Sequence, residues 1–342
     1  FLRAFYYYRL FINFGERLPM FEHELEGTEE EFYPPQVEAG RLKTFIETEL
    51  SECQANLPEK WNTNMAGRVT KYTAAALLGK YYMFIGEKAK AKTEFWKVID
   101  SHRYELMENY GDNFNGLHEN NKESILEVQF TGSGCGAYEE AYPSKWLFNT
   151  LKKDLTEDGE YSDRLYETII FDDPKSRPFY YEDGKGFSDY HQEDNIYWRK
   201  YVTYDKSLGD YWDYSGFNIP LIRYADILLL YAECLNDEGN SKEAIKYINK
   251  VRDRVHVTPL SDTLSKEQVL KHLQDVERPC ELALEGSRWY DLIRWGIVEN
   301  ALKSHEKPFA SNFISTKHIR LAIPHKEFLM NPDWVQNEGY TK

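Results

Sequence analysis

An internal repeat constrains the fold of this chain more than any other feature of its sequence. When the sequence is shifted by 153 residues, Gly79 aligns with Ala232 and Gly86 aligns with Gly239. Four further pairs of similar size align under the same shift: Tyr82 with Leu235, Ala91 with Ala244, Phe95 with Ile248 and Val98 with Val251. Such a repeat predicts two copies of one supersecondary unit.

The residue pattern within each copy predicts two antiparallel helices. In the first copy, Gly79 and Ala91 are small where the helices would cross, so that the two backbones can approach closely. Gly86 suits the left-handed end of the first helix. This pattern is typical of tetratricopeptide (TPR) hairpins. Because one hairpin cannot bury its own apolar face, we expect further hairpins around residues 1–57 and 264–302.

The remaining chain predicts a mainly α fold with a few short strands. Apolar residues at helical spacing predict helices at 1–14, 36–57, 68–101 (broken at Gly86), 221–256 (broken at Gly239) and 281–296. Capping boxes at Ser265–Gln268 and Asn240–Glu243 would open two helices. ESILEVQF (123–130) and HIRLAIP (318–324) are candidate strands.

We divide the chain into three regions on this basis. Residues 1–130 are expected to form N-terminal TPR-like hairpins, and residues 221–342 to form C-terminal TPR-like helices. Residues 131–220 are rich in Gly, Asp and aromatic residues and are expected to be an irregular ligand-binding region. The chain begins at Phe1 inside an expected helix, so we interpret it as lacking an N-terminal part that could carry a targeting signal.

Composition excludes several functional classes. The formal net charge of −15 argues against a nucleic-acid binder and against docking on anionic lipid. No apolar run is long enough for a transmembrane helix. The four cysteines form no C-x-x-C pair, and Cys234 is expected to be a small core residue. Catalytic residues, cofactors and metal sites are not predicted, although scattered acids could form a surface calcium site that no motif reveals.

Two features of the sequence look like functional motifs, but we predict neither a cofactor site nor a catalytic site from them. TGSGCGA (131–137) nominally matches a dinucleotide-binding loop, but Pro143 interrupts the segment that should form its helix. Glu285 and Asp291 are expected to share a helix with Arg288 and Arg294, so ion pairing explains them better than acid–base chemistry.

Aromatic residues concentrate in one segment. Residues 178–217 contain 13 of them, interleaved with Asp, Asn, Gln, Arg and Lys. Most should pack, but rings edged by hydrogen-bonding groups also suit sugars, whose apolar faces stack on aromatic side chains. Our candidate ligand-binding residues, chosen from composition, are Tyr138, Tyr142, Tyr190, Trp198, Tyr211 and Trp212.

Several segments together resemble the SusD/RagB family of surface glycan-binding lipoproteins from Bacteroidetes. They include FLRAFYYYRLFINFGERLP at the start, IPLIRYADILLLYAECLNDEGNSKEAIKYINKVRDRV, ELALEGSRWYDLIRWG and the ending LAIPHKEFLMNPDWVQNEGY. The resemblance implies a mostly helical fold with four TPR-like hairpins as scaffold. It also implies that loops preceding the first helix here would supply part of the glycan site.

The family resemblance also implies a function. Such proteins are not enzymes; they sit on the outer membrane as surface-exposed lipoproteins beside a SusC-like TonB-dependent transporter and deliver oligosaccharides to it. Two alternatives stay open: capture of peptides, as in RagB-type relatives, or a TPR module that binds only proteins. An all-α glycoside hydrolase is the less favoured third reading, because abundant carboxylates alone do not single out a catalytic pair.

Overall fold

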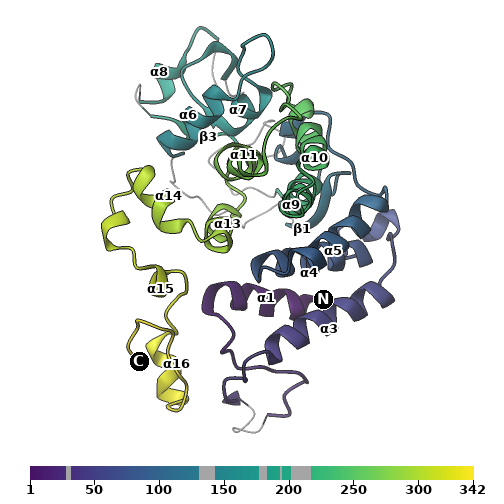
Figure 1. Cartoon of the computed structure of the whole chain (residues 1–342), viewed down its shortest axis with the longest axis vertical. Helices are drawn as coiled ribbons and strands as arrows, with labels where there is room; N and C mark the ends of the chain where they lie inside the picture. The colour runs from purple at the N-terminus through teal and green to yellow at the C-terminus, as the bar shows by residue number, and fades with distance from the viewer. Residues whose placement is uncertain (28–31, 131–142, 177–182, 193–194, 202–216) are drawn as a thin grey trace.

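The computed structural model describes residues 1–27, 32–130, 143–176, 183–192, 195–201 and 217–342 (Figure 1). The first repeated hairpin consists of α4 (Lys71–Phe84) and α5 (Lys88–Asp100). The second consists of α9 (Tyr224–Asp237) and α10 (Ser241–Arg254), and α9 packs against α5. The repeat therefore predicted both hairpins, and the two stack on one another.

Corresponding backbone hydrogen bonds close the first helix of each hairpin. In the first, Gly86 has φ 81° and the amide of Glu87 donates to the carbonyl of Tyr82 at 2.9 Å. In the second, Gly239 has φ 84° and the amide of Asn240 donates to the carbonyl of Leu235 at 2.9 Å. These bonds define the Schellman ending, in which glycine adopts the left-handed conformation at least cost.

The small residues lie where the helices cross. A β-carbon added to Gly79 would come within 2.5 Å of Cε1 of Phe95, which is fully buried. The second hairpin has Ala232 and Ile248 at the corresponding positions, both fully buried. A larger residue on one helix is thus matched by a smaller one on the other, which keeps each crossing filled.

Further helices extend the scaffold on both sides, as expected. α1 (Leu2–Phe14) packs against α3 (Arg41–Asn56), which packs against α4. α11 (Lys266–His272) packs against α9 and begins with the predicted Ser265–Gln268 capping box. The other α-helices are α6 (Lys145–Lys153), α7 (Asp163–Thr168), α8 (Phe187–Tyr190), α12 (Arg278–Glu281), α13 (Arg288–Trp295), α14 (Val298–Ser304), α15 (Ser315–His318) and α16 (His325–Met330).

Four short strands complete the described structure. β1 (Ser124–Val128) was predicted and pairs antiparallel with β4 (Ile219–Arg223). β2 (Ile169–Ile170) pairs antiparallel with β3 (Tyr197–Trp198). Single turns of 3₁₀ or π helix lie at Thr63–Met65, Tyr110–Asn113, Pro174–Ser176, Leu273–Glu277 and Ala310–Asn312. The mainly α fold class is confirmed.

Three local predictions are wrong. Asn240 makes no side-chain capping bond, because it already serves the closing turn of α9. Residues 318–324 form no strand: the amide of Leu321 donates to the carbonyl of Asn13 and its carbonyl accepts from the side chain of Asn337. The helix expected at 281–296 is interrupted by a left-handed turn at Leu284 (φ 63°) and Gly286 (φ 73°).

The elements form successive tiers in Figure 1. The N-terminal helices α1, α3, α4 and α5 lie at the centre and right, α9 and α10 lie above them, and α6–α8 with β3 form the upper tier. Helices α13–α16 run down the left side to the C-terminus. One large apolar cluster joins α1, α3–α5 and α9–α11, and a smaller one lies beneath α6 and α7. Among the described helices, none combines the length and apolar character needed to cross a bilayer.

Candidate ligand-binding region

The upper tier carries the described part of the aromatic segment. Helix α6 begins at Ser144, whose hydroxyl accepts from the amide of Leu147, and it buries Leu147 and Leu151. Helix α7 leads directly into β2, which holds β3 through the Ile169–Trp198 and Ile170–Tyr197 pairs. The β2–β3 ladder thereby fixes the backbone of the two adjacent rings of β3.

Successive strand residues point to opposite faces, so the two rings of β3 have different surroundings. The ring of Tyr197 lies 4.2 Å from that of His191 and 6.2 Å from that of Phe187. Burial lowers the pKa of His191. Trp198 instead packs on the apolar cluster that contains Leu165 and Phe171. Its buried Nε1 has no hydrogen-bond partner among the described residues.

The six candidate residues divide according to what the structure describes. Tyr138, Tyr142, Tyr211 and Trp212 lie outside the described residues. Tyr190, at the end of α8, is 36% exposed, whereas Trp198 is half-buried. The structure therefore places two candidates in the upper tier, one facing solvent and one packed on α6 and α7. The assignment of the six to a ligand site remains a prediction.

Sequence reasoning did not find a groove between α6, α11, α13 and α14. It encloses a volume of about 780 Å³. Trp146 of α6 lies at its edge, and its ring stacks on that of His305 with centroids 3.9 Å apart and planes at 27°. Arg288 of α13 places its guanidinium carbon 5.1 Å from the centroid of the Trp146 ring. Trp146 is 142 positions from Arg288 and 159 positions from His305 in the chain, so no local pattern could have linked it to them.

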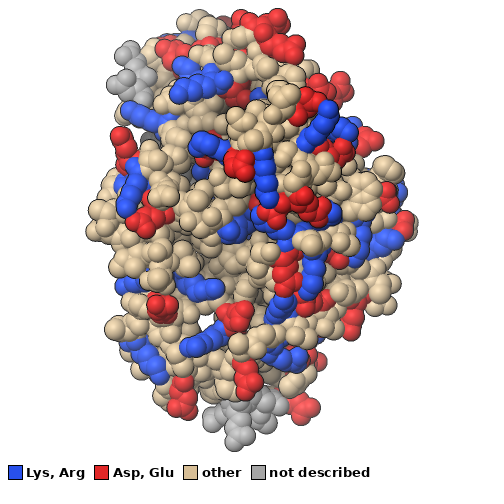
Figure 2. Space-filling model, in the orientation of Figure 1, with Lys and Arg blue, Asp and Glu red and all other residues tan. Residues whose placement is uncertain are grey.

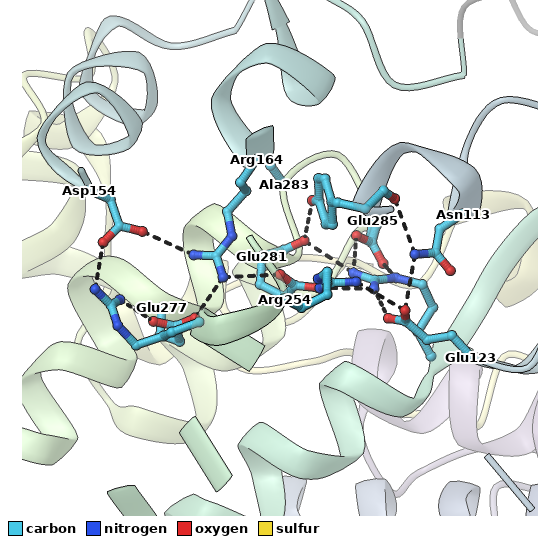
Figure 3. A network of polar contacts seen from close by, with 12 residues as sticks. Asn113, Glu123, Asp154, Arg164, Arg254, Glu277, Glu281, Ala283 and Glu285 are labelled. Carbon is cyan, nitrogen blue, oxygen red and sulfur yellow. Dashed lines mark hydrogen bonds and ion pairs between the residues drawn. The ribbon is translucent and has the colours of Figure 1, made fainter. Parts of the chain in front are cut away.

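A buried network of charges joins the upper tier to the scaffold (Figure 3). Arg164 of α7 lies 3.1 Å from Asp154 and 2.8 Å from Glu277. Arg252 of α10 binds the same two carboxylates, at 3.0 Å and 2.7 Å. Two carboxylates are thus shared between a helix of the upper tier and a helix of the second hairpin.

The network continues across the strand pair. Arg223, at the end of β4, pairs with Glu123 and lies 3.0 Å from Glu281 and 2.7 Å from Glu285. Lys200, just after β3, lies 2.8 Å from Glu285. Counted together, five cations face five carboxylates: Arg164, Lys200, Arg223, Arg252 and Arg254 with Glu123, Asp154, Glu277, Glu281 and Glu285. The formal charge of the set is therefore zero.

Burial and pairing shift the ionisation of its members in opposite ways. Burial lowers the pKa of Lys200 to about 8, although Glu285 opposes the change. At Glu281, burial alone would raise the pKa, but the guanidinium groups of Arg254 and Arg223 lower it to about 2. Glu281 is consequently held ionised at neutral pH, as a structural ion network requires. Among the described residues, no three His, Cys, Asp or Glu side chains gather as metal ligands would.

The family follows from comparison with known proteins. A sequence model of the SusD family matches residues 54–340. This chain belongs to the SusD family. The SusD-like protein P25 of Formosa agariphila is 26% identical over 99% of this chain and 72% of its own length. A SusD superfamily crystal structure from Bacteroides vulgatus is 25% identical with a TM-score of 0.85, covering 99% of this chain and 76% of that one. A laminarin-binding SusD-like protein is 27% identical with a TM-score of 0.74, covering 99% and 77%.

The segment that carried the SusD resemblance most clearly is part of the ion networks. RYADILLLYAE begins with Arg223, which joins the network already described. Asp226 of the same segment pairs with Lys80 and, at 2.8 Å, with Arg278, and Glu233 lies 2.6 Å from Arg294. In this SusD-family chain, the polar positions of the segment therefore hold the scaffold together.

Proposed function

We propose that this chain captures an extracellular oligo- or polysaccharide at the cell surface and is not an enzyme. The observation that carries the proposal is membership of the SusD family together with the aromatic-rich sequence of residues 178–217. The similarity to a laminarin-binding SusD-like protein supports a carbohydrate ligand. Two or three rings stacking at about 1–1.5 kcal/mol each would give weak, roughly millimolar binding before hydrogen bonds are added.

Weak capture suffices if the ligand is passed on directly. We propose that the chain is held at the outer membrane as a lipoprotein and hands its ligand to a SusC-like TonB-dependent transporter. A polymer that engages its site repeatedly beside the transporter raises the local ligand concentration without tight binding. Co-purification of the full-length protein with such a transporter from outer membranes would support this step, and its absence would count against it.

Affinity electrophoresis through gels that contain different polysaccharides tests the binding step. Retardation without new reducing ends in the same samples is the expected result. New reducing ends would contradict the binding role and favour a hydrolase. If no polysaccharide gel retards the protein and the protein binds peptides, peptide capture would be favoured instead.

Tyr190→Ala tests the proposed stacking platform. Tyr190 is 36% exposed at the end of α8, so its loss should weaken glycan binding by about five- to tenfold. Tyr6→Ala is the matched control, because Tyr6 is 63% exposed on α1 of the scaffold, away from the upper tier (Figure 1). Equal binding by both variants, measured by calorimetry, would remove Tyr190 from the site.

A further inference from the structure

The groove edged by Trp146 has acidic residues, but their charges are already neutralised. Asp154 binds Arg164 and Arg252 of the buried network at 3.1 Å and 3.0 Å. Asp275 pairs with Lys271 one helical turn away. Neither carboxylate lies within ion-pair distance of Lys153 or Arg288, the other two cations that line the groove.

Two cations of the groove remain without a carboxylate. Within the described part of the chain, Lys153 at the end of α6 makes no ion pair or hydrogen bond. Arg288 donates one hydrogen bond, at 2.6 Å, to the carbonyl of Gln274 and lies over the Trp146 ring, but it has no carboxylate within ion-pair distance there. The groove thus places two cations without an ion-pair partner among the described residues beside an aromatic ring.

Arg288 differs in this respect from the arginines of the buried network. Burial lowers its pKa, whereas at Arg164 and Arg252 the carboxylates outweigh the same effect of burial and raise the pKa. The neighbouring His305 also has a lowered pKa, because of burial and then because of Arg288 and Lys307. Burial therefore prevails at both groups, although Asp291 and Asp275 oppose the lowering at Arg288 and Asp275 opposes it at His305.

We propose that this groove binds an anionic substituent of the glycan, a uronate carboxylate or a sulfate ester, with Lys153 and Arg288 pairing the anion and Trp146 contacting the sugar ring. The proposal rests on the proposed glycan-binding function and specifies the class of sugar. A guanidinium presents a planar fork of donors that matches the oxygens of a carboxylate or a sulfate.

The net charge of −15 does not prevent such binding. At physiological ionic strength, charges more than about 8 Å away are largely screened, so the local set of side chains dominates. Figure 2 shows acidic and basic side chains interspersed over the drawn face of the molecule, without a broad field of one sign. Discrimination between acidic and neutral glycans would therefore depend on a few positioned cations.

The test compares three polysaccharides on the full chain: polygalacturonate, κ-carrageenan and neutral laminarin. We expect binding to polygalacturonate or κ-carrageenan that weakens at least threefold between 0.15 and 0.5 M NaCl, as ion pairing requires. Binding of polygalacturonate alone would identify the anionic group as a carboxylate. Binding of κ-carrageenan alone would identify it as a sulfate ester. Lys153→Gln and Arg288→Gln should each weaken binding of the acidic polymer about tenfold.

Lys152→Gln is the control. It removes the same charge from the neighbouring position of α6, but Lys152 lies over the rings of Phe148 and Tyr161 and does not line the groove. It should change binding less than twofold. Lys153 is exposed and unpaired among the described residues, so its variant tests the groove even if Arg288→Gln fails to fold.

Three results would overturn the proposal. Binding of acidic polymers that neither groove variant weakens, or that Lys152→Gln weakens equally, would show that the groove is not the site. Binding of laminarin alone would leave the glycan-binding function standing and remove the anionic specificity. Binding of no polysaccharide at all would contradict both.

Discussion

Arg223 illustrates how much a single buried side chain contributes here. Its side chain is 1% exposed and pairs with Glu123, Glu281 and Glu285. Arg223→Met would leave these carboxylates partly uncompensated in a low-dielectric interior. We expect a loss of about 3–5 kcal/mol in the free energy of unfolding, measured by urea denaturation.

An exposed pair provides the comparison for that variant. Lys303 and Glu299 on α14 are 58% and 45% exposed, so Lys303→Met should cost less than about 1 kcal/mol. Similar losses for Lys303→Met and Arg223→Met would mean that the buried network adds little to stability.

Acid should destabilise the protein through the same network. The pKa of Glu281 is about 2 in the folded chain, against an ordinary value of 4.5. Because the folded pKa is depressed, its contribution is fully present above pH 4.5 and is lost as the pH falls through 2. The shift corresponds to about 3 kcal/mol. Urea unfolding at stepped pH should show this decline.

Glu281→Gln isolates the contribution of that one carboxylate. The variant should be less stable at pH 7 and should lose less further stability between pH 4.5 and 2. Glu299→Gln, at an exposed position on α14, should leave the slope of the pH dependence unchanged. An unaltered slope in Glu281→Gln would assign the acid sensitivity to other groups.

At the scale of the element, each helix crossing depends on a small residue on one helix facing a large residue on the other. Gly79→Ala would place a β-carbon 2.5 Å from the buried ring of Phe95. Overpacking costs about 1–3 kcal/mol, which the better helix propensity of alanine offsets by about 1 kcal/mol. We expect a net loss of stability, measured by thermal or urea unfolding.

A second substitution should relieve that clash. The double variant Gly79→Ala with Phe95→Ile reproduces the Ala232 and Ile248 pair of the second hairpin. The two changes together should cost less than the sum of the single variants. Strict additivity would show that the crossing has relaxed in some other way.

Signals within single helices and turns explain which elements the sequence could predict. The hairpins and the Ser265 cap were found because their signals are local: helical spacing, turn glycines and a capping residue three positions from its partner. The predicted cap at Asn240 was wrong because the sequence does not show whether a residue between two helices caps the following helix or closes the preceding one. Residues 318–324 alternate like a strand, but a strand also needs a partner, which the sequence does not specify.

The candidate site was much less predictable than the scaffold. Aromatic composition made residues 178–217 a candidate region, but it could not orient individual rings. The surroundings of Tyr197 and Trp198 depend on the pairing of β3 with β2. The groove and the ion networks join side chains from distant parts of the chain. Arg164 and Glu277, for example, are 113 positions apart. Such contacts follow from the tertiary fold and leave no periodic signal.

At the scale of the whole molecule, the network should make unfolding cooperative. It links α7, β4 and α10, which belong to the upper tier and to the scaffold. The three regions assigned from sequence, 1–130, 131–220 and 221–342, should therefore not melt separately. We expect coincident transitions in far-ultraviolet circular dichroism and tryptophan fluorescence. Two separated transitions would show that the upper tier unfolds on its own.

The pairing of five buried cations with five buried carboxylates also disfavours incorrect packings of the helices. An apolar interior accepts many alternative packings of similar helices, and this chain contains two similar hairpins that could exchange places. Each wrong arrangement would bury the same charges without their partners, at a cost of several kcal/mol. We expect the network to make such arrangements much less stable than the native one. Surface loops that contact ligands could then diverge in sequence while the interior continues to specify a single assembly.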